Sequence, residues 1–291
     1  MRVIIFGAGG QDGFYLNKLL QERCIEVVGI SRKGFFVQGD VADYGFVELM
    51  IKEHRPDYII HFAASSNTRH SELFENHETI STGTLNILEA VRLHNPYSKV
   101  FLSGSAMQFK NEGLPINEET PFEASSAYSV ARIQSVYAAR YYREKFGLRV
   151  YIGYFFNHDS PLRSEQYINQ KIVRAVQRIH RGSIEKLELG NIEMLKEFGF
   201  AGDCARAVWI LLNQDKVFEA VIGTGQAYSI KDWVIECFES IEKDWLDYVN
   251  IQKDFIAEYN ILVSKPDIIR SLGWEPEVGF KQLSQLMMFK H

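Results

Sequence analysis

The chain has 291 residues, of which 46% are hydrophobic and 24% are charged, and its formal net charge is −5. This length allows one large domain or a domain with a smaller companion. The acidic balance argues against nucleic acid as a partner. No apolar run approaches the ~20 residues of a membrane span, and the first strand is too short for a signal-peptide core. We therefore expect a cytoplasmic protein.

The first predicted strand, residues 3–6, runs into the turn Gly7-Ala8-Gly9-Gly10-Gln11-Asp12-Gly13, and a helical pattern follows over 14–20. Glycines permit φ > 0, let a pyrophosphate approach the backbone, and allow close packing of helix and strand. The amides at the helix start then face the phosphates. The turn therefore predicts dinucleotide binding, although a strand, turn and helix without a ligand can carry the same letters.

Strands and helices alternate through the first half of the chain. Strands are predicted over 26–30, 35–37, 58–62, 99–102 and 148–155, and helices over 44–54, 84–93 and 126–146. This alternation indicates a parallel, doubly wound α/β sheet with right-handed crossovers. After Phe156, longer irregular stretches separate helices predicted over 168–181, 204–212 and 230–241. We expect residues 1–156 to form a Rossmann-type dinucleotide-binding domain and 157–291 mainly a smaller substrate-binding lobe at the carboxyl edge of the sheet.

The end of the second strand carries Ser31-Arg32-Lys33. A carboxylate here would bind the ribose 2′-hydroxyl of NAD(H), whereas a cation accommodates a 2′-phosphate. Arg32 and Lys33 therefore favour NADP(H) over NAD(H). A solvated turn would also carry such charges, and this alternative stays open.

Metal and disulfide chemistry have no support in the sequence. The cysteines Cys24, Cys204 and Cys237 show no CxxC spacing, and the histidines show neither the i, i+4 nor the HxH spacing of a metal site. For His61, on a predicted strand, a satisfied or exposed ring is the better interpretation.

Several motifs carry a resemblance to a known family. The most specific are Gln11-Asp12-Gly13 and Asn157-His158-Asp159-Ser160-Pro161. More widely shared are Gly39-Asp40, Phe62-Ala63-Ala64, Gly83-Thr84-Leu85, Tyr128 four residues before Arg132, Leu189-Gly190-Asn191 and Leu272-Gly273-Trp274. Over nearly its whole length the chain resembles the extended short-chain dehydrogenase/reductase superfamily of NAD-dependent epimerases and dehydratases. Within it, the chain is most similar to the GDP-mannose 4,6-dehydratase group of nucleotide-sugar enzymes.

The resemblance implies a set of ligand contacts. For the cofactor these are Gly7, Gly10, Gln11, Asp12, Gly13, Arg32, Lys33, Asp40, Ala63, Tyr128 and Arg132, with Asp40 near the adenine. For a nucleotide-sugar substrate, with a GDP-hexose expected, they are Ser66, Asn157, Arg163, Lys171 and Lys196. Phe255 stands near an expected Arg-Pro pair, so one phosphate contact is missing. The helices at 84–93 and 126–146 would pair in a two-fold homodimer.

The predicted catalytic pair departs from the family pattern. In the family, a Lys four residues after the Tyr orients the nicotinamide ribose and lowers the Tyr pKa, so that the Tyr exchanges a proton with the sugar hydroxyl. Here the pair is Tyr128 and Arg132. Arg keeps the positive charge but is bulkier and does not deprotonate, so it cannot relay a proton.

A second departure follows the strand at 99–102. The dehydratases carry a Ser or Thr, one further residue and then a Glu, with an aromatic residue two places further on. If Phe109 is that aromatic residue, Ser105 stands at the Ser/Thr position and Met107 at the Glu position. A thioether does not titrate, so Met107 cannot supply the acid/base chemistry of 4,6-elimination. A register shifted by one would pair Ala106 with Gln108 instead, and the Glu is absent in either register.

Three hypotheses remain open. The first is an oxidoreductase that uses Ser105, Tyr128 and NADP(H) for hydride transfer at C4 of the hexose, as a ketoreductase or an epimerase. The second is an atypical 4,6-dehydratase in which another residue, for instance Glu123 or Glu165, replaces the Glu. The third is a catalytically degenerate relative that binds cofactor or sugar nucleotide without turnover.

Overall fold

A seven-stranded parallel sheet forms the centre of the computed structural model, which describes residues 1–252 and 258–289. Phe255 lies outside the described residues. In spatial order the strands are β11 (Glu219–Ile222), β6 (Arg149–Phe155), β5 (Lys99–Ser105), β4 (Tyr58–His61), β1 (Arg2–Phe6), β2 (Glu26–Ser31) and β3 (Val37–Gln38). Connections run outward in opposite directions from β1 and β4, which confirms the predicted doubly wound α/β fold and places its ligand crevice at their carboxyl ends.

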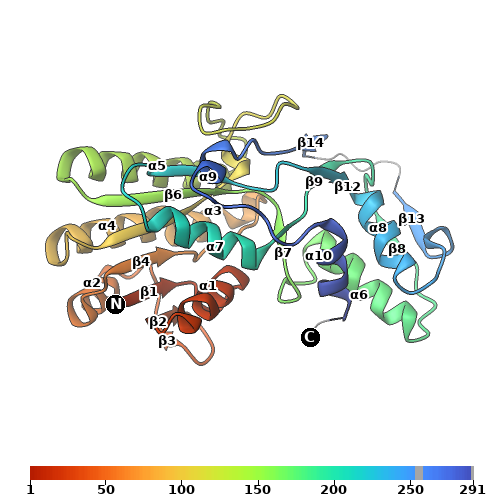
Figure 1. Cartoon of the computed structure of the whole chain (residues 1–291), viewed down its shortest axis with the longest axis horizontal. Helices are drawn as coiled ribbons and strands as arrows, with labels where there is room; N and C mark the ends of the chain where they lie inside the picture. Colours follow the sequence, from red (N-terminus) through yellow and green to blue (C-terminus); the bar gives the residue numbers. More distant parts are fainter. Residues whose placement is uncertain (253–257, 290–291) are drawn as a thin grey trace.

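Both faces of the sheet are covered by helices, as Figure 1 shows. Ile4 and Phe6 of β1 belong to the core that includes α2 (Tyr44–His54), α4 (Gly83–His94) and α5 (Ala127–Phe146). Val3 and Ile5 belong to the opposite core, with α1 (Gln11–Glu22) and α7 (Ala201–Leu212). These four side chains are at most 1% exposed. Burying such a side chain contributes about 1.5–3 kcal/mol, so the apolar run of β1 holds both layers.

A third, smaller core is built from residues of the C-terminal half. It lies among α6 (Ile168–His180), α8 (Ile230–Glu239) and α10 (Phe280–Phe289), on the right of Figure 1. Trp233 is fully buried in it and stacks on Phe198 at 5.0 Å between ring centroids. Residues after 156 are thus divided between this lobe core and the main sheet, since α7 and β11 pack with that sheet.

The remaining elements are short. The strands are β7 (His158–Asp159), β8 (Leu187–Leu189), β9 (Leu195–Glu197), β10 (Gly199–Phe200), β12 (Ala227–Ser229), β13 (Val249–Ile251) and β14 (Ile261–Leu262). The helices are α3 (Leu73–Asn76), α9 (Asp267–Ser271), a π-helical turn over His77–Thr82, and 3-10 turns at His70–Glu72, Ala106–Gln108 and Trp245–Asp247. None of the described helices combines the length and apolarity needed to cross a membrane.

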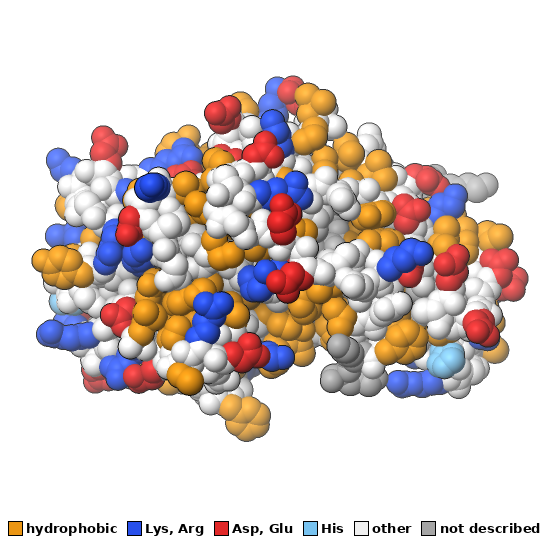
Figure 2. All heavy atoms as spheres, viewed as in Figure 1, with side chains coloured by type: hydrophobic (Ala, Val, Ile, Leu, Met, Phe, Trp, Pro, Cys, Tyr) orange, Lys and Arg blue, Asp and Glu red, His pale blue; other side chains and the backbone are white. Residues whose placement is uncertain are grey.

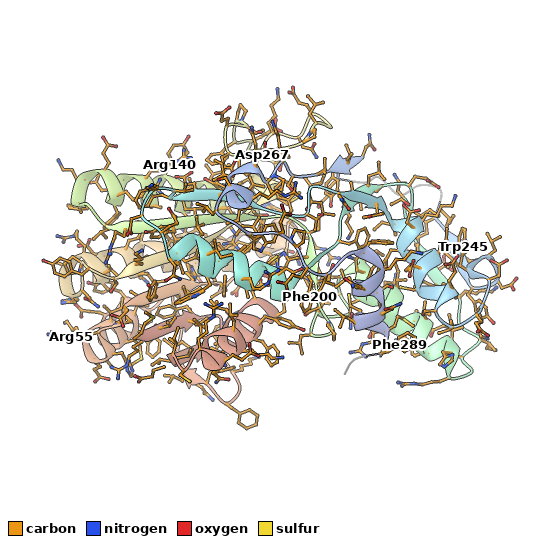
Figure 3. All side chains as sticks on the ribbon, viewed as in Figure 1. Arg55, Arg140, Phe200, Trp245, Asp267 and Phe289 are labelled. Atoms are coloured by element: carbon orange, nitrogen blue, oxygen red, sulfur yellow. The ribbon has the colours of Figure 1, made fainter. Side chains whose placement is uncertain are left out.

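Phe200 links the two parts of the molecule. Figure 3 labels it at the start of α7, between α1 and the small lobe. Its ring lies 5.0 Å from that of Tyr15 on α1, edge to face. This contact fixes the lobe next to the helix that begins at the glycine-rich turn.

Figure 2 shows acidic and basic side chains interspersed over the face that it displays.

Most predicted elements of the first half occur, and the differences have local causes. The third strand spans 37–38 rather than 35–37, because Gly34 turns the chain at φ +94° and Phe36 packs over Gly29. The strand β11 was absent from the expectations, since its four residues, Glu219–Ile222, follow an irregular stretch.

Candidate active site

The glycine-rich turn leads from β1 into α1 with little space around two of its glycines. Gly7 has φ +92°, and a Cβ atom there would lie 2.6 Å from the Ala63 nitrogen. A Cβ on Gly13 would lie 2.4 Å from the Gly7 oxygen, so Gly13 lets α1 pack on the turn. Gly10 begins the helix as its N-cap, and the nearest atom to a Cβ there is 3.5 Å away. The backbone at Gly10 is thus open to a ligand.

A groove of about 560 Å³ extends from this turn to the end of β2. Of the predicted cofactor residues, it is lined by Gly7, Gly10, Arg32, Lys33, Asp40 and Ala63. Gln11 lies deeper: its Nε2 donates to the His158 carbonyl at 3.3 Å, and its Oε1 accepts from Ser160 Oγ at 3.0 Å. The structure therefore brings six of the predicted residues to one groove and uses Gln11 to hold the segment after β6.

A second cavity, of about 270 Å³, lies at the carboxyl ends of β4, β5 and β6. Predicted residues in its lining are Asp12, Ser66, Ser105, Tyr128, Arg132, Asn157 and Arg163, and Met107 joins them. Phe62 lines both this cavity and the groove. A long ligand in the groove and a second ligand in the cavity would meet at this wall.

Arg132 holds Tyr128 from one turn further along α5. Its Nε donates to Tyr128 Oη at 3.1 Å, and its Nη1 donates to both the carbonyl and the hydroxyl (2.8 Å) of Ser103 on β5. Arg132 is 4% exposed and Tyr128 6%. Because a guanidinium only donates, Tyr128 Oη accepts from Arg132 and keeps its own proton for another partner.

The residues at the end of β5 and in the loop after it differ in burial and in their contacts. Ser105 ends the strand at 9% exposure, and its Oγ accepts from the Met107 backbone nitrogen at 3.2 Å. Gln108 is fully buried, and its Oε1 accepts from the Ser105 nitrogen at 2.9 Å. Met107, and not Gln108, is therefore the side chain that lines the cavity.

The carboxylates considered as substitutes for the missing Glu lie elsewhere. Glu165 pairs with Arg178 at 2.8 Å and does not line the cavity, whereas Glu123 lines an adjoining cavity of about 470 Å³. Glu258, which the sequence did not single out, lines both cavities, and its Oε1 accepts from Thr68 Oγ1 at 2.7 Å. The sequence offers no signal for this long-range contact.

Asp12 and His158 form a partly buried pair beside the start of α1. His158 Nε2 lies 2.8 Å from Asp12 Oδ1, and its Nδ1 lies 2.8 Å from the Phe156 carbonyl. Burial opposes both charges, yet the charge of His158 and its hydrogen bond lower the pKa of Asp12. Burial likewise opposes protonation of His158, but Asp12 raises its pKa. The pair therefore favours a carboxylate with an imidazolium.

The predicted substrate residues divide into two groups. Ser66, Asn157 and Arg163 line the cavity with Tyr128. Arg163 Nε donates no hydrogen bond to any described residue, its nearest carboxylate oxygen is Asp159 Oδ1 at 3.5 Å, and its guanidinium covers the Tyr167 ring at 3.7 Å. Asn157 Oδ1 is also buried without a hydrogen-bond partner among the described residues. These two buried atoms therefore have hydrogen-bonding capacity that the described residues do not use.

Lys171 and Lys196 do not line this cavity. Lys171 Nζ donates to the Glu188 carbonyl at 2.8 Å. Lys196 is 5% exposed, and burial lowers its pKa to about 8 against the opposing effect of Asp159. The structure thus brings three of the five predicted substrate residues to one cavity and leaves these two outside its lining.

His61 is neither exposed nor hydrogen-bonded. It is 1% exposed, and neither ring nitrogen has a partner within the described part of the chain. Burial, assisted by the charge of Arg132, lowers its pKa to about 3, so the ring is neutral. Residues 1–252 and 258–289 contain no group of three or more His, Cys, Asp or Glu side chains arranged to hold a metal ion.

Comparison with known proteins gives consistent results. The family described as GDP-mannose 4,6 dehydratase matches residues 4–287. GDP-mannose 4,6 dehydratase 1 of Arabidopsis thaliana is 32% identical, over 98% of this chain and 88% of that protein.

Solved structures share the fold at lower identity. The dTDP-glucose 4,6-dehydratase of Bacillus anthracis, solved with NAD, has a TM-score of 0.87 at 19% identity, over 99% of this chain and 95% of the other. RMD from Pseudomonas aeruginosa, solved with NADPH, has a TM-score of 0.84 at 21% identity, over 99% and 97%. Fold, family match and sequence identity agree: the chain belongs to the GDP-mannose 4,6-dehydratase family of nucleotide-sugar enzymes.

Proposed function

We propose that this protein is an NADP(H)-dependent oxidoreductase that transfers hydride at C4 of a GDP-linked hexose, as a ketoreductase or an epimerase. The single observation that carries the proposal is the position of Tyr128 in the cavity, where its Oη accepts a hydrogen bond from Arg132 Nε at 3.1 Å. The same cavity is lined by Met107, a thioether at the position where the family carries a Glu. This site keeps a proton donor and lacks the expected elimination base.

The groove fits a nicotinamide dinucleotide. Gly10 leaves its helix N-terminus open, and Gly7 and Gly13 occupy positions where a Cβ would clash. Two solved relatives of the same fold carry NAD and NADPH. Arg32 and Lys33 at the end of β2 support a 2′-phosphate, hence NADP(H). On this proposal residues 1–156 mainly bind the dinucleotide, and residues 157–291 mainly bind the substrate.

The protein's own residues would move the proton and position the sugar. Tyr128 Oη donates its proton to the C4 oxygen during reduction and accepts it during oxidation, while Ser105 holds the same oxygen. A bound nicotinamide supplies or accepts the hydride. Arg163 would bind the diphosphate, since a guanidinium without a full complement of partners suits that anion, and Asn157 would donate to it from its amide nitrogen.

An atypical 4,6-dehydratase is the second candidate, because Glu258 places a carboxylate in the lining of the Tyr128 cavity. A mass spectrum of products separates the candidates. The protein is incubated with GDP-mannose or with its 4-keto-6-deoxy derivative, and with NADP⁺ or NADPH. Gain of two hydrogen atoms by the keto sugar supports the reductase, and loss of water from GDP-mannose supports the dehydratase. Binding without any change in the mass of the sugar, and without any change in its C4 configuration by NMR, would contradict both and indicate a degenerate relative.

We also propose that α4 and α5 form a homodimer interface. These neighbouring helices expose Leu85 (48%), Tyr137 (59%) and Tyr141 (55%), and large apolar or aromatic side chains exposed on adjacent helices suit a contact with a second copy. Light scattering after gel filtration should give twice the chain mass. Tyr137→Glu should give the monomer, and a monomeric wild type would contradict the interface.

A further inference from the structure

Glu75 lies across the cofactor groove from the end of β2. It belongs to α3, in the connection between β4 and α4, a segment for which the sequence predicted no element. Its Oε1 is 2.7 Å from Arg32 Nη1, and both side chains line the groove. Thr79 Oγ1 approaches the same carboxylate oxygen at 3.5 Å. The carboxylate of Glu75 therefore pairs with Arg32, the cation that we expect to bind a 2′-phosphate.

The groove at the end of β2 is thus lined by both acidic and basic side chains. Lys33 and Asp40 also line the groove, and Lys33 forms no ion pair with any described residue. A dianionic 2′-phosphate would gain Lys33 but would meet the like charge of Glu75 beside Arg32. A 2′-hydroxyl carries no charge and can donate a hydrogen bond to the Glu75 carboxylate. The pair consequently weakens the preference for NADP(H) that Arg32 and Lys33 would otherwise give, and leaves the site able to bind NAD(H).

From this arrangement we infer that Glu75 is a specificity-determining residue: by holding Arg32 it weakens binding of the 2′-phosphorylated dinucleotide and keeps the site open to the 2′-hydroxyl form. The inference rests on the proposed binding of a nicotinamide dinucleotide. It adds that the NADP(H) preference of Arg32 and Lys33 is limited by a residue from a distant part of the chain.

The expected size of the effect is modest. Arg32 and Glu75 are partly exposed, with side-chain exposures of 56% and 34%. An exposed ion pair is screened by water and salt, so its loss should change affinity by about three- to fivefold. The change should be larger at low ionic strength.

The test is a pair of binding titrations on the full chain without substrate, with NADP⁺ and NAD⁺ followed by calorimetry. Glu75→Gln keeps the side-chain shape and should lower the Kd of NADP⁺ by about three- to fivefold, with the Kd of NAD⁺ unchanged or higher. Glu78→Gln is the matched control, because Glu78 loses the same charge one turn later and does not line the groove. In an Arg32→Gln background, the gain from Glu75→Gln should shrink.

The outcomes separate this inference from the proposed function. If the wild type binds neither dinucleotide, the proposed function fails and the inference fails with it. If both dinucleotides bind and Glu75→Gln leaves their ratio at the wild-type value, the inference alone is overturned. An equal gain in Glu78→Gln would also overturn it, since that result would reflect net charge rather than the pairing with Arg32.

Discussion

Tyr128 accepts a hydrogen bond from Arg132 Nε at 3.1 Å, and the same guanidinium is fixed to Ser103 on β5. One residue on α5 thereby sets the position of another against the carboxyl end of the sheet. The arrangement keeps the positive charge next to the Tyr hydroxyl while leaving the Tyr proton free for a substrate oxygen. The proposed reaction depends on this geometry.

Replacement of Tyr128 by Phe should remove the proton donor and leave the cavity shape nearly intact. We expect kcat for reduction of the keto sugar to fall by about a hundredfold or more, as for loss of a general acid. Substrate affinity, measured separately by calorimetry, should change little. Turnover at the wild-type rate would show that Tyr128 is not the proton donor.

Replacement of Arg132 by Lys should cost stability before it costs chemistry. A Lys ammonium keeps the charge but has a single nitrogen to serve Tyr128 and the buried Ser103, so we expect a loss of about 1–3 kcal/mol in the free energy of unfolding. Denaturant titration measures that loss. Arg132→Met should be less active than Arg132→Lys, and equal activity of the two would argue against a role for the charge.

Replacement of Met107 by Glu tests the missing elimination base. Met107 lines the Tyr128 cavity, so a carboxylate at this position would reach the same space. We predict slow loss of water from GDP-mannose without external reductant, detected by mass spectrometry. Met107→Gln provides the control, because the amide has the same shape and does not titrate. The same rate of water loss in the two variants would refute the explanation.

The pair of Asp12 and His158 predicts a pH dependence of stability. The pKa of Asp12 is lowered in the folded protein, so its contribution is complete above the unfolded value near 4 and is lost as the pH falls through the folded value. The pKa of His158 is raised, so its contribution is complete below about 6.5 and is lost as the pH rises through the folded value.

The difference in unfolding free energy between wild type and Asp12→Asn should therefore be largest between about pH 4 and 6.5, at about 1–3 kcal/mol. Denaturant titrations across this range measure it. Curves that stay parallel at every pH would show that the pair contributes no proton-linked stability.

The periodic parts of the fold were predictable from the sequence, as the helix over 44–54 illustrates. Asp43 accepts from the Phe46 nitrogen at its start, and Pro56 follows its end, so local signals set both bounds. The four-residue β11 and helix α10 escaped prediction, because their identity as sheet edge and lobe core depends on contacts distant in sequence.

The candidate site was likewise predictable only in part. A motif fixes the order of residues, and so the sequence identified Ser105, Met107 and Tyr128, which line one cavity. It does not fix side-chain direction, so it gave no sign that Lys171 donates to the Glu188 carbonyl. Glu75 belongs to no motif, and its contact with Arg32 arises only when the fold brings α3 to the groove at the end of β2.

Hydride transfer at C4, with Tyr128 as proton donor, can be followed atom by atom with an isotope. The most direct test is NADPH deuterated at the transferred position of the nicotinamide, incubated with the 4-keto-6-deoxy sugar nucleotide, with the product examined by NMR. We expect deuterium on C4 of the sugar in the wild type and almost none with Tyr128→Phe. Deuterium at another carbon, or an unlabelled sugar in the presence of bound NADPH, would contradict it.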